Sequence, residues 1–370
     1  MFYTLLKKQL LEESSNYYPE SESPRYNKIT VKKRVINLGK RIFYSRLFIN
    51  LIIANNYLFK EIFLGKVFSL KKYLNPLESF YNKLETDASK KLLLKLMAFR
   101  ILGYVKVKLP LNTKEYWNGL EEVYKNEGNE FIELDYAPFK LPFHDLTNFS
   151  FPIKVYLHSK ALYMTFMIHH YDHKIDNTHT IKVEKDDVVL DLGGCYGDSS
   201  LYFANLAGEN GKVYSFEFIP SNLEVLNKNL ALNPTLKHRI EIVDKPLWDV
   251  SGKKVFYSDL GASSKVGFEN SSEMSGQTET LSIDDFVNTK ELKRLDFIKT
   301  DIEGAEPFAI KGAIKSISKF KPKLAISIYH NMSDFTGIVN QIDELNLGYK
   351  FYLGHATTYS SETVLFCTVN

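Results

Sequence analysis

Short apolar runs alternate with helical patterns from Lys182 to the end of the chain, and this alternation constrains the fold most strongly. Consecutive parallel strands need a crossover connection, usually a helix. The alternation therefore predicts an α/β fold with a doubly wound, mostly parallel sheet. The expected strands cover residues 188–192, 213–216, 240–243, 295–299, 324–328, 349–353 and 363–368. The last two leave no room for a helix, so we expect an antiparallel hairpin at the sheet edge.

Four segments between these strands have a helical pattern. Ser221 is the expected N-cap of the second helix, because Glu224 follows it at capping-box spacing. The expected helices cover residues 199–206, 221–232, 307–317 and 335–345.

The residues before this domain do not show the alternation of strand and helix patterns. The best helical pattern there runs from Leu92 to Leu102. Further on, the β-rich runs Ile153–Leu157 and Leu162–Met167 flank a short polar turn, which predicts a hairpin. We therefore divide the chain into a mainly helical region of unknown role over residues 1–130, a β-rich connecting segment over 131–176 and the α/β domain over 177–370.

Composition excludes several classes of protein. The 47 basic and 44 acidic residues give a net charge of only +3, which does not favour nucleic acid or an anionic membrane as a partner. Polar and charged residues interrupt the stretch from Leu47 to Leu70, so no transmembrane segment is expected. Cys195 and Cys367 are far apart and no signal-peptide layout is present, so we expect reduced thiols in a cytoplasmic protein. The oligomeric state stays open.

A glycine-rich turn follows the first expected strand of the α/β domain. Gly193, Gly194 and Gly197 allow a ligand to approach the backbone closely, because no Cβ blocks it. The following helix begins with free N–H groups and a partial positive charge, which suit a phosphate or a carboxylate. Asp198 and Ser199 are candidate side-chain contacts to that group.

An acid stands at the end of the second expected strand. Glu217 lies 20 residues beyond Gly197, where a carboxylate can accept hydrogen bonds from both ribose hydroxyls of NAD or of S-adenosylmethionine. Asp191 lies inside the first strand, beside the turn. Its negative charge would repel a pyrophosphate and attract a sulfonium, so we favour S-adenosyl-L-methionine as the cofactor.

These residues resemble the FkbM-type methyltransferases over roughly Lys182 to Cys367. The resemblance implies a seven-stranded class I, Rossmann-like fold and O-methylation, often of sugars in antibiotics, lipopolysaccharide or other surface glycans. At two positions the chain departs from the family pattern, and there Phe218 and Trp248 are expected to flank the adenine. The segments that carry the resemblance are 189–194, 213–217, 229–233, 280–286 and 295–306.

Three side chains that follow expected strands are candidates for catalysis: Asp301, His330 and His355. Methyl transfer to oxygen needs an aligned acceptor and usually a base. His330 is the first choice, since the ordinary pKa of histidine, about 6.5, suits proton removal near neutral pH. Asp301 is also expected to contact the cofactor or the substrate.

A metal site is an alternative that we do not favour from the sequence. Asp301, Glu303, His330 and His355 could together hold a divalent cation that acidifies a hydroxyl. The run His169–His173 also resembles a metal cluster. Because successive side chains of a strand point to opposite faces, we interpret it as a solvated loop or a cofactor lid.

The sequence therefore predicts an S-adenosylmethionine-dependent O-methyltransferase that acts on a small-molecule or glycan acceptor, with a sugar hydroxyl as the favoured target. Two other interpretations stay open. One is an NAD(P)-dependent oxidoreductase with the same sheet, and the other is a non-catalytic cofactor-binding or scaffold protein.

Overall fold

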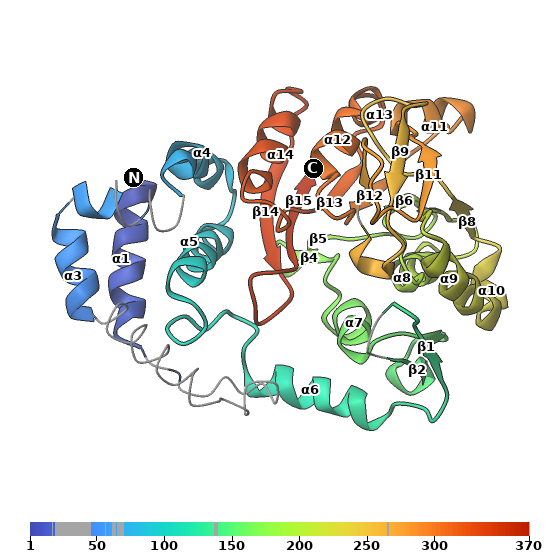
Figure 1. The fold of residues 1–370 in the computed structure, drawn as a ribbon, viewed down its shortest axis with the longest axis horizontal. Coiled ribbons are helices and arrows are strands. Elements are labelled where there is room, and N and C mark those ends of the chain that lie inside the picture. Colours follow the sequence, from blue (N-terminus) through green and yellow to red (C-terminus); the bar gives the residue numbers. More distant parts are fainter. Residues whose placement is uncertain are drawn as a thin grey trace. The chain divides into compact units, whose positions relative to one another are not determined.

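The computed structural model describes residues 1–16, 18, 46–55, 57–60, 64, 70–136, 140–264 and 266–369. These residues form two compact units (Figure 1). The first contains Met1–Asn118 and Tyr352–Thr363, and the second contains Gly119–Phe351 and Val364–Asn370.

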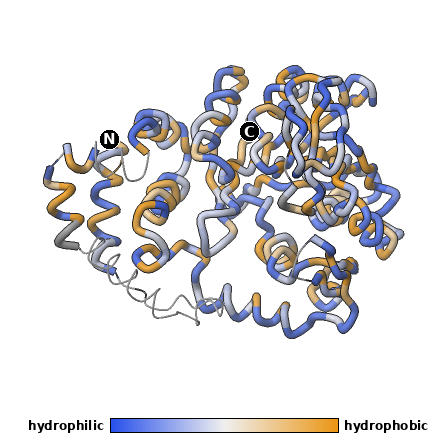
Figure 2. The backbone as a smooth tube through the Cα atoms, viewed as in Figure 1, coloured by the Kyte–Doolittle hydropathy of each residue, from blue (hydrophilic) through white to orange (hydrophobic). Residues whose placement is uncertain are grey.

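The Met1–Asn118 part of the first unit is mainly helical where the structure describes it. Leu93, Met97 and Ile101 of its longest helix are buried at helical spacing, which confirms the helix predicted around 92–102. This helix, α5, contains both hydrophobic and hydrophilic residues along its length (Figure 2). Part of the stretch from Leu47 to Leu70, which was tested above as a membrane span, and residues 19–45 lie outside the described residues. The helices are α1 (Phe2–Ser14), α3 (Arg46–Ala54), η3 (Lys71–Tyr73), α4 (Leu74–Lys83), α5 (Asp87–Leu102) and α6 (Lys114–Lys125), the last of which continues into the second unit.

The segment that precedes the large sheet mixes short strands and helical turns. The hairpin predicted from Ile153–Leu157 and Leu162–Met167 is wrong. Only the first run forms a strand, whereas the second is helical and buried over most of its length. The His158 side chain also accepts a hydrogen bond from the backbone N–H of Lys160 and so caps a helix there. The elements are β1 (Phe131–Glu133), β2 (Lys140–Asp145), η4 (Leu146–Phe149), β3 (Lys154–Tyr156), α7 (Ser159–Leu162), the π-helix η5 (Tyr163–Ile168), β4 (His173–Lys174) and β5 (Thr180–Ile181).

The large sheet has seven strands in the order β14-β15-β13-β12-β6-β7-β8. The pairs from β13 to β8 are parallel, and β15 runs antiparallel to β13. All seven predicted strands and the strand pair at the edge are thereby confirmed. The strands are β6 (Val188–Leu192), β7 (Lys212–Phe216), β8 (Ile240–Val243), β12 (Phe297–Thr300), β13 (Lys323–Ser327), β14 (Lys350–His355) and β15 (Thr363–Thr368).

The connecting helices differ from prediction in two details. Ser221 is not an N-cap: the second helix begins at Pro220 after Ile219, and the Ser221 hydroxyl instead donates to Asp259. The helix predicted over 307–317 is two helices, which separate near Gly312. The helices are α8 (Asp198–Ala207), α9 (Pro220–Leu232), α10 (Pro234–Lys237), α11 (Ile283–Thr289), α12 (Glu306–Lys311), α13 (Ile314–Phe320) and α14 (Asp334–Asp343).

A small antiparallel sheet follows β8, and the sequence patterns did not predict it. It consists of β9 (Lys254–Tyr257), β10 (Val266–Gly267) and β11 (Gly276–Glu279), in the order β10-β9-β11. Among the described residues, no helix combines the length and the apolar character that crossing a bilayer requires.

Candidate functional site

The register of the sheet brings the predicted site residues to one edge. Leu192 pairs with Phe216 on one side and with Thr300 on the other, and Thr300 pairs with Ile326. The residues that follow these parallel strands therefore share the carboxyl edge of the sheet, where ligands bind in open α/β folds. The glycine turn, Glu217, Asp301 and His330 all lie in these segments.

The backbone conformation and the close packing of the turn require its glycines, whether or not a ligand binds. Gly193 has a φ of +86°, and a Cβ there would lie 1.9 Å from the backbone oxygen of Asp301. A Cβ on Gly194 would lie 2.2 Å from the Ser215 hydroxyl oxygen, and Gly197 has a φ of +87°. From the sequence, a Cβ at these glycines was expected to obstruct a ligand. The structure shows that it would first obstruct neighbouring strand ends, so the turn fastens β6 to β7 and β12.

Replacing Gly193 by alanine is expected to destabilise the protein by about 3 kcal/mol or more, because left-handed strain adds to a backbone clash. Gly252 is the matched control: its φ is +79°, but nothing lies within 4 Å of a Cβ there. Gly252→Ala should cost only the strain, about 1–2 kcal/mol. Urea unfolding of both variants measures the difference, and equal midpoints would contradict the packing argument.

Asp191 does not offer a free negative charge, which corrects the electrostatic argument from the sequence. Its side chain is fully buried, and Oδ1 lies 3.0 Å from Lys299 Nζ. The Ser199 and Ser200 hydroxyls donate to its other oxygen. Burial lowers the pKa of Lys299, but nearby carboxylates, Asp191 foremost, outweigh it and raise that pKa, so Lys299 keeps its charge. The pair also supports the turn, because Lys299 Nζ donates to the Gly193 carbonyl at 2.7 Å.

The helix that follows the turn, α8, begins without a side-chain cap. Gly197 is its N-cap, so backbone N–H groups of the first turn have no side-chain acceptor there. The Asp198 carboxylate accepts a hydrogen bond from the Thr165 hydroxyl at 2.7 Å, and burial raises its pKa. The Ser199 hydroxyl is turned inward onto Asp191, so this residue presents its backbone rather than its side chain to a ligand.

Glu217 is buried at the end of β7 and is fixed by its own loop. One carboxylate oxygen accepts from the backbone N–H groups of Phe218 and Ile219, at 2.7 and 2.8 Å, and the other accepts from Asn222 at 3.1 Å. Burial raises the pKa of Glu217. Each carboxylate oxygen can accept more than one hydrogen bond, so Glu217 keeps capacity for a ligand hydroxyl.

The two aromatic residues expected to flank an adenine lie in different surroundings. Phe218 meets Tyr257 of β9 edge to face, with ring centroids 5.5 Å apart. Trp248 stacks on Phe308 of α12 at 4.0 Å and meets Phe268 edge on. The small sheet therefore contributes to the wall beside Phe218, and the adenine contacts of both rings stay a prediction.

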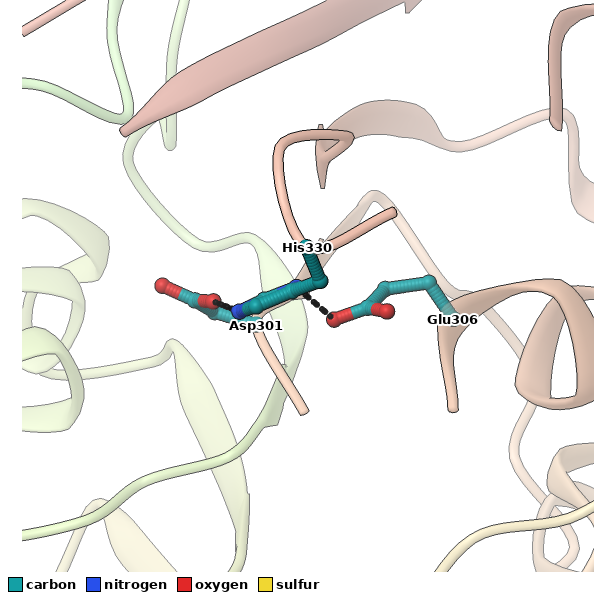
Figure 3. Close-up of side chains that lie close together, drawn as sticks. All are labelled: Asp301, Glu306 and His330. Atoms are coloured by element: carbon teal, nitrogen blue, oxygen red, sulfur yellow. Dashed lines mark ion pairs between the residues drawn. The ribbon is translucent and has the colours of Figure 1, made fainter. Parts of the chain in front are cut away.

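His330 lies between two carboxylates at the ends of β12 and β13. Figure 3 shows its ring between Asp301 and Glu306, with Nδ1 3.1 Å from Glu306 Oε1 and Nε2 3.5 Å from Asp301 Oδ1. A third carboxylate, Glu303, lies 3.6 Å from Nε2. Burial disfavours the charged ring, but these three acids outweigh it and raise the pKa of His330 to about 9. The ordinary pKa assumed from the sequence is therefore wrong, and the free ring carries a proton at neutral pH.

The run His169–His173 packs into the domain and is not a solvated loop. His170 and Tyr171 are buried, and the His169 ring contacts the Tyr202 hydroxyl at 2.7 Å. The Tyr171 hydroxyl donates to Asp301 at 3.0 Å, as Tyr329 does from the other side at 3.1 Å. Tyr171, Glu306 and Lys299 are site residues that sequence reasoning missed. A lysine within a buried strand was a usable signal, because such a charge requires an acid nearby.

His355 lies in the part of β14 that belongs to the first compact unit. Its Nδ1 is 2.9 Å from the Thr363 hydroxyl, and burial lowers its pKa to about 4. The group of potential metal ligands that the structure brings together contains Asp301, Glu306 and His330. That group does not include His355, whose catalytic role stays a prediction.

Comparison with known proteins agrees with this arrangement. A family model described as the Methyltransferase FkbM domain matches residues 191–351. No curated protein matches the chain. A solved structure described as methyltransferase FkbM from Methylobacillus flagellatus KT is 18% identical, covers 92% of this chain and 71% of its own, and has a TM-score of 0.52.

Two further solved structures have lower similarity. Fibrillarin from Aeropyrum pernix, with natively bound S-adenosyl-L-methionine, is 11% identical and covers 50% of this chain and 68% of its own, at a TM-score of 0.33. Precorrin-6y C5,15-methyltransferase from Geobacter metallireducens GS-15 is 12% identical and covers 57% of this chain and 86% of its own, at a TM-score of 0.32. These scores are too low to carry an inference.

The observed fold is the class I methyltransferase fold that the resemblance implies, with its seven-stranded, mostly parallel sheet and antiparallel edge. The matched residues contain the glycine turn, Glu217, Asp301 and His330. Residues 191–351 therefore form an FkbM methyltransferase domain.

Proposed function

We propose that this protein transfers the methyl group of S-adenosylmethionine to a hydroxyl oxygen of a sugar-containing acceptor. The observation that supports it best is the convergence of the glycine turn, Glu217 and the Asp301–His330 pair at one sheet edge. Three hydrogen bonds hold these parts together: Phe216 O accepts from the Gly193 and Gly194 N–H groups at 3.0 and 2.9 Å, and Lys299 Nζ donates to the Gly193 carbonyl. A cofactor site and an acidic, histidine-containing site are thereby adjacent.

The residues of this edge fit the parts of the cofactor. Glu217 has acceptor capacity for the ribose hydroxyls, and the uncapped start of α8 offers N–H groups to the methionine carboxylate. Phe218 and Trp248 are the aromatic residues proposed for the adenine. When bound, the cofactor supplies an electrophilic methyl group on a sulfonium.

The sign of the local charge favours a cationic cofactor, but for a different reason than the sequence suggested. Asp191 is neutralised by Lys299. The excess negative charge comes instead from Asp301, Glu303 and Glu306, which surround a single imidazole. This field attracts a sulfonium and repels the pyrophosphate of a dinucleotide.

Asp301 and His330 are the proposed residues for the acceptor hydroxyl. Asp301 is the more exposed of the two, and two tyrosine hydroxyls hold its carboxylate in place. An oxygen that gains a methyl group makes its proton strongly acidic, so a fixed carboxylate is a sufficient acceptor. His330 orients this carboxylate and the hydroxyl.

The acceptor class rests on the family resemblance, which implies sugar hydroxyls of a glycan, a lipopolysaccharide or a glycosylated metabolite. We also propose a cytoplasmic location, because Cys195 and Cys367 are both free thiols. Incubation with labelled S-adenosylmethionine and fractionated cell glycans, lipids and protein tests the acceptor. Label is expected in the glycan or glycolipid fraction, and label in protein alone would contradict it.

S-adenosylhomocysteine, but not NADH, is expected to raise the melting temperature of the protein. A ligand at 100 times its Kd stabilises a folded protein by about 2.7 kcal/mol, which thermal unfolding detects readily. Stabilisation by NADH instead would indicate the oxidoreductase. Stabilisation by S-adenosylhomocysteine with no label transferred to any fraction would support the non-catalytic binding protein.

A further inference from the structure

The His330 ring has one close carboxylate and two more distant ones. Nδ1 lies 3.1 Å from Glu306 Oε1, whereas Nε2 lies 3.5 Å from Asp301 Oδ1 and 3.6 Å from Glu303 Oε2. Hydrogen bonds from nitrogen to oxygen normally span about 2.7–3.2 Å. Neither ring nitrogen makes a hydrogen bond among the residues that the structure describes, but only Nδ1 lies within that distance of a carboxylate. Nε2 faces two carboxylate oxygens across a gap.

The surroundings of this gap are buried and rich in negative charge. The His330 side chain is 9% exposed, and Glu306 is fully buried. Glu306 Oε1 accepts from the Ile302 N–H at 2.8 Å, but Oε2 has no hydrogen-bond partner within the described part of the chain. A buried carboxylate oxygen without a hydrogen bond raises the free energy of the folded state unless a cation lies nearby. Three carboxylates share one imidazole here, so a second cation would offset the remaining charge.

The spacing of the donor atoms suits a metal ion. Asp301, Glu306 and His330 each offer a donor atom, and these atoms all lie within 4.8 Å of one another. Glu303 does not belong to that group, but its Oε2 lies 3.6 Å from His330 Nε2. Two adjacent ligands of an octahedral ion with bonds of about 2.1 Å lie about 3 Å apart. The separations of 3.5 and 3.6 Å around Nε2 approach this value and exceed a hydrogen bond.

We propose that Asp301, Glu303 and His330 bind a divalent cation of the magnesium or manganese type, and that Glu306 fixes the ring through Nδ1. A carboxylate on the second nitrogen of a ligating histidine sets its tautomer and orientation, which is the place that Glu306 occupies. Carboxylate oxygens suit magnesium and manganese, and the imidazole shifts the preference toward manganese. Relative to the set predicted from the sequence, His355 is omitted from the ligands and Glu306 is added behind His330 as the residue that orients the ring.

The ion would also change the chemistry of the site. A divalent cation at this edge would lower the pKa of the acceptor hydroxyl, so that its proton would pass to water as the methyl group is transferred, with Asp301 and His330 holding the ion. This role rests on the proposed function, whereas the binding of the ion does not.

Titration of the metal-free protein with Mn²⁺, followed by the electron paramagnetic resonance signal of free Mn²⁺, tests the site directly. One Mn²⁺ per chain is expected to lose its free signal, and excess Mg²⁺ should restore it by competition. An undiminished free signal at millimolar protein and Mn²⁺ would overturn the proposal.

Variants locate the ion. Asp301→Asn should weaken Mn²⁺ binding at least tenfold, and Glu306→Gln by about 10–100-fold, as loss of an outer-shell partner does. His179→Ala is the matched control, because His179 forms a comparable pair with Asp176 at 3.0 Å on the exposed surface. Equal affinity in Asp301→Asn and His179→Ala would place the ion elsewhere and overturn the proposal.

Methyl transfer and S-adenosylhomocysteine binding, measured on the same samples, separate the two proposals. Mn²⁺ binding without cofactor binding would contradict the proposed function and leave the metal site standing. Methyl transfer that survives exhaustive chelation, together with no Mn²⁺ binding, would overturn the metal site and leave the function standing.

Discussion

His330→Ala is expected to lower the rate of methyl transfer by about 10²–10⁴-fold while the affinity for S-adenosylhomocysteine changes little. The reason is positional. The groups proposed to hold the cofactor follow β6 and β7, whereas His330 follows β13 and contacts acids at the end of β12. Single-turnover transfer of labelled methyl, with cofactor affinity from calorimetry, measures both quantities. Retained turnover would remove His330 from the reaction.

Loss of the ring also leaves Glu306 buried without its neighbouring cation, so the variant should be checked for folding. Asp301→Asn is the second variant, because it keeps the shape of the side chain, and its amide oxygen can still accept from one of the two tyrosine hydroxyls. It should lose turnover to a similar extent. His179→Ala is again the control, and it should retain full activity because its pair with Asp176 lies on the exposed surface.

Lys299→Met is expected to lower the free energy of unfolding by about 3–5 kcal/mol, the usual cost of leaving one member of a buried ion pair alone. Lys299 is 2% exposed and Asp191 is fully buried, so water cannot solvate the carboxylate that remains. The Gly193 carbonyl also loses its donor. Urea unfolding monitored by circular dichroism provides the measurement.

An exposed ion pair of equal length supplies the control. Lys311 Nζ lies 3.0 Å from Asp249 Oδ2, as Lys299 lies 3.0 Å from Asp191, but the Lys311 side chain is 61% exposed. Lys311→Met should therefore change stability little. Adding Asp191→Asn to Lys299→Met should recover part of the loss, since the amide removes the unpaired charge. Equal costs for the two lysines would show that burial is not the cause.

The strands of the large sheet could be predicted because they are buried on both faces. Runs such as Val188–Leu192 are then almost continuously apolar. The small sheet of β9 to β11 escaped prediction because its strands are short and half exposed, as in Gly276–Glu279. The second half of the predicted hairpin, Leu162–Met167, failed for the opposite reason. A short apolar run does not distinguish a buried strand from a buried helical turn.

The site could be predicted as a set of positions but not as a set of contacts. Strand order placed Glu217, Asp301 and His330 at one edge, because parallel strands end together. The pairing of Asp191 with Lys299 depends on the register of two strands more than 100 residues apart, and spacing carries no information about it. The pKa of His330 depends likewise on carboxylates that only the folded chain brings near.

The hydrogen bond from the Tyr171 hydroxyl to Asp301 bears on where the part of the chain that carries the candidate site begins. The family match starts at residue 191, yet Tyr171 and Thr165 lie upstream and bond acids of the site, in a compact unit that begins at Gly119. A fragment cut at the family boundary would expose the carboxylates of Asp301 and Asp198 to solvent on that side. The segment before the first sheet strand thus supplies two of the contacts that hold acids of the candidate site, so any fragment made to test this site must include it.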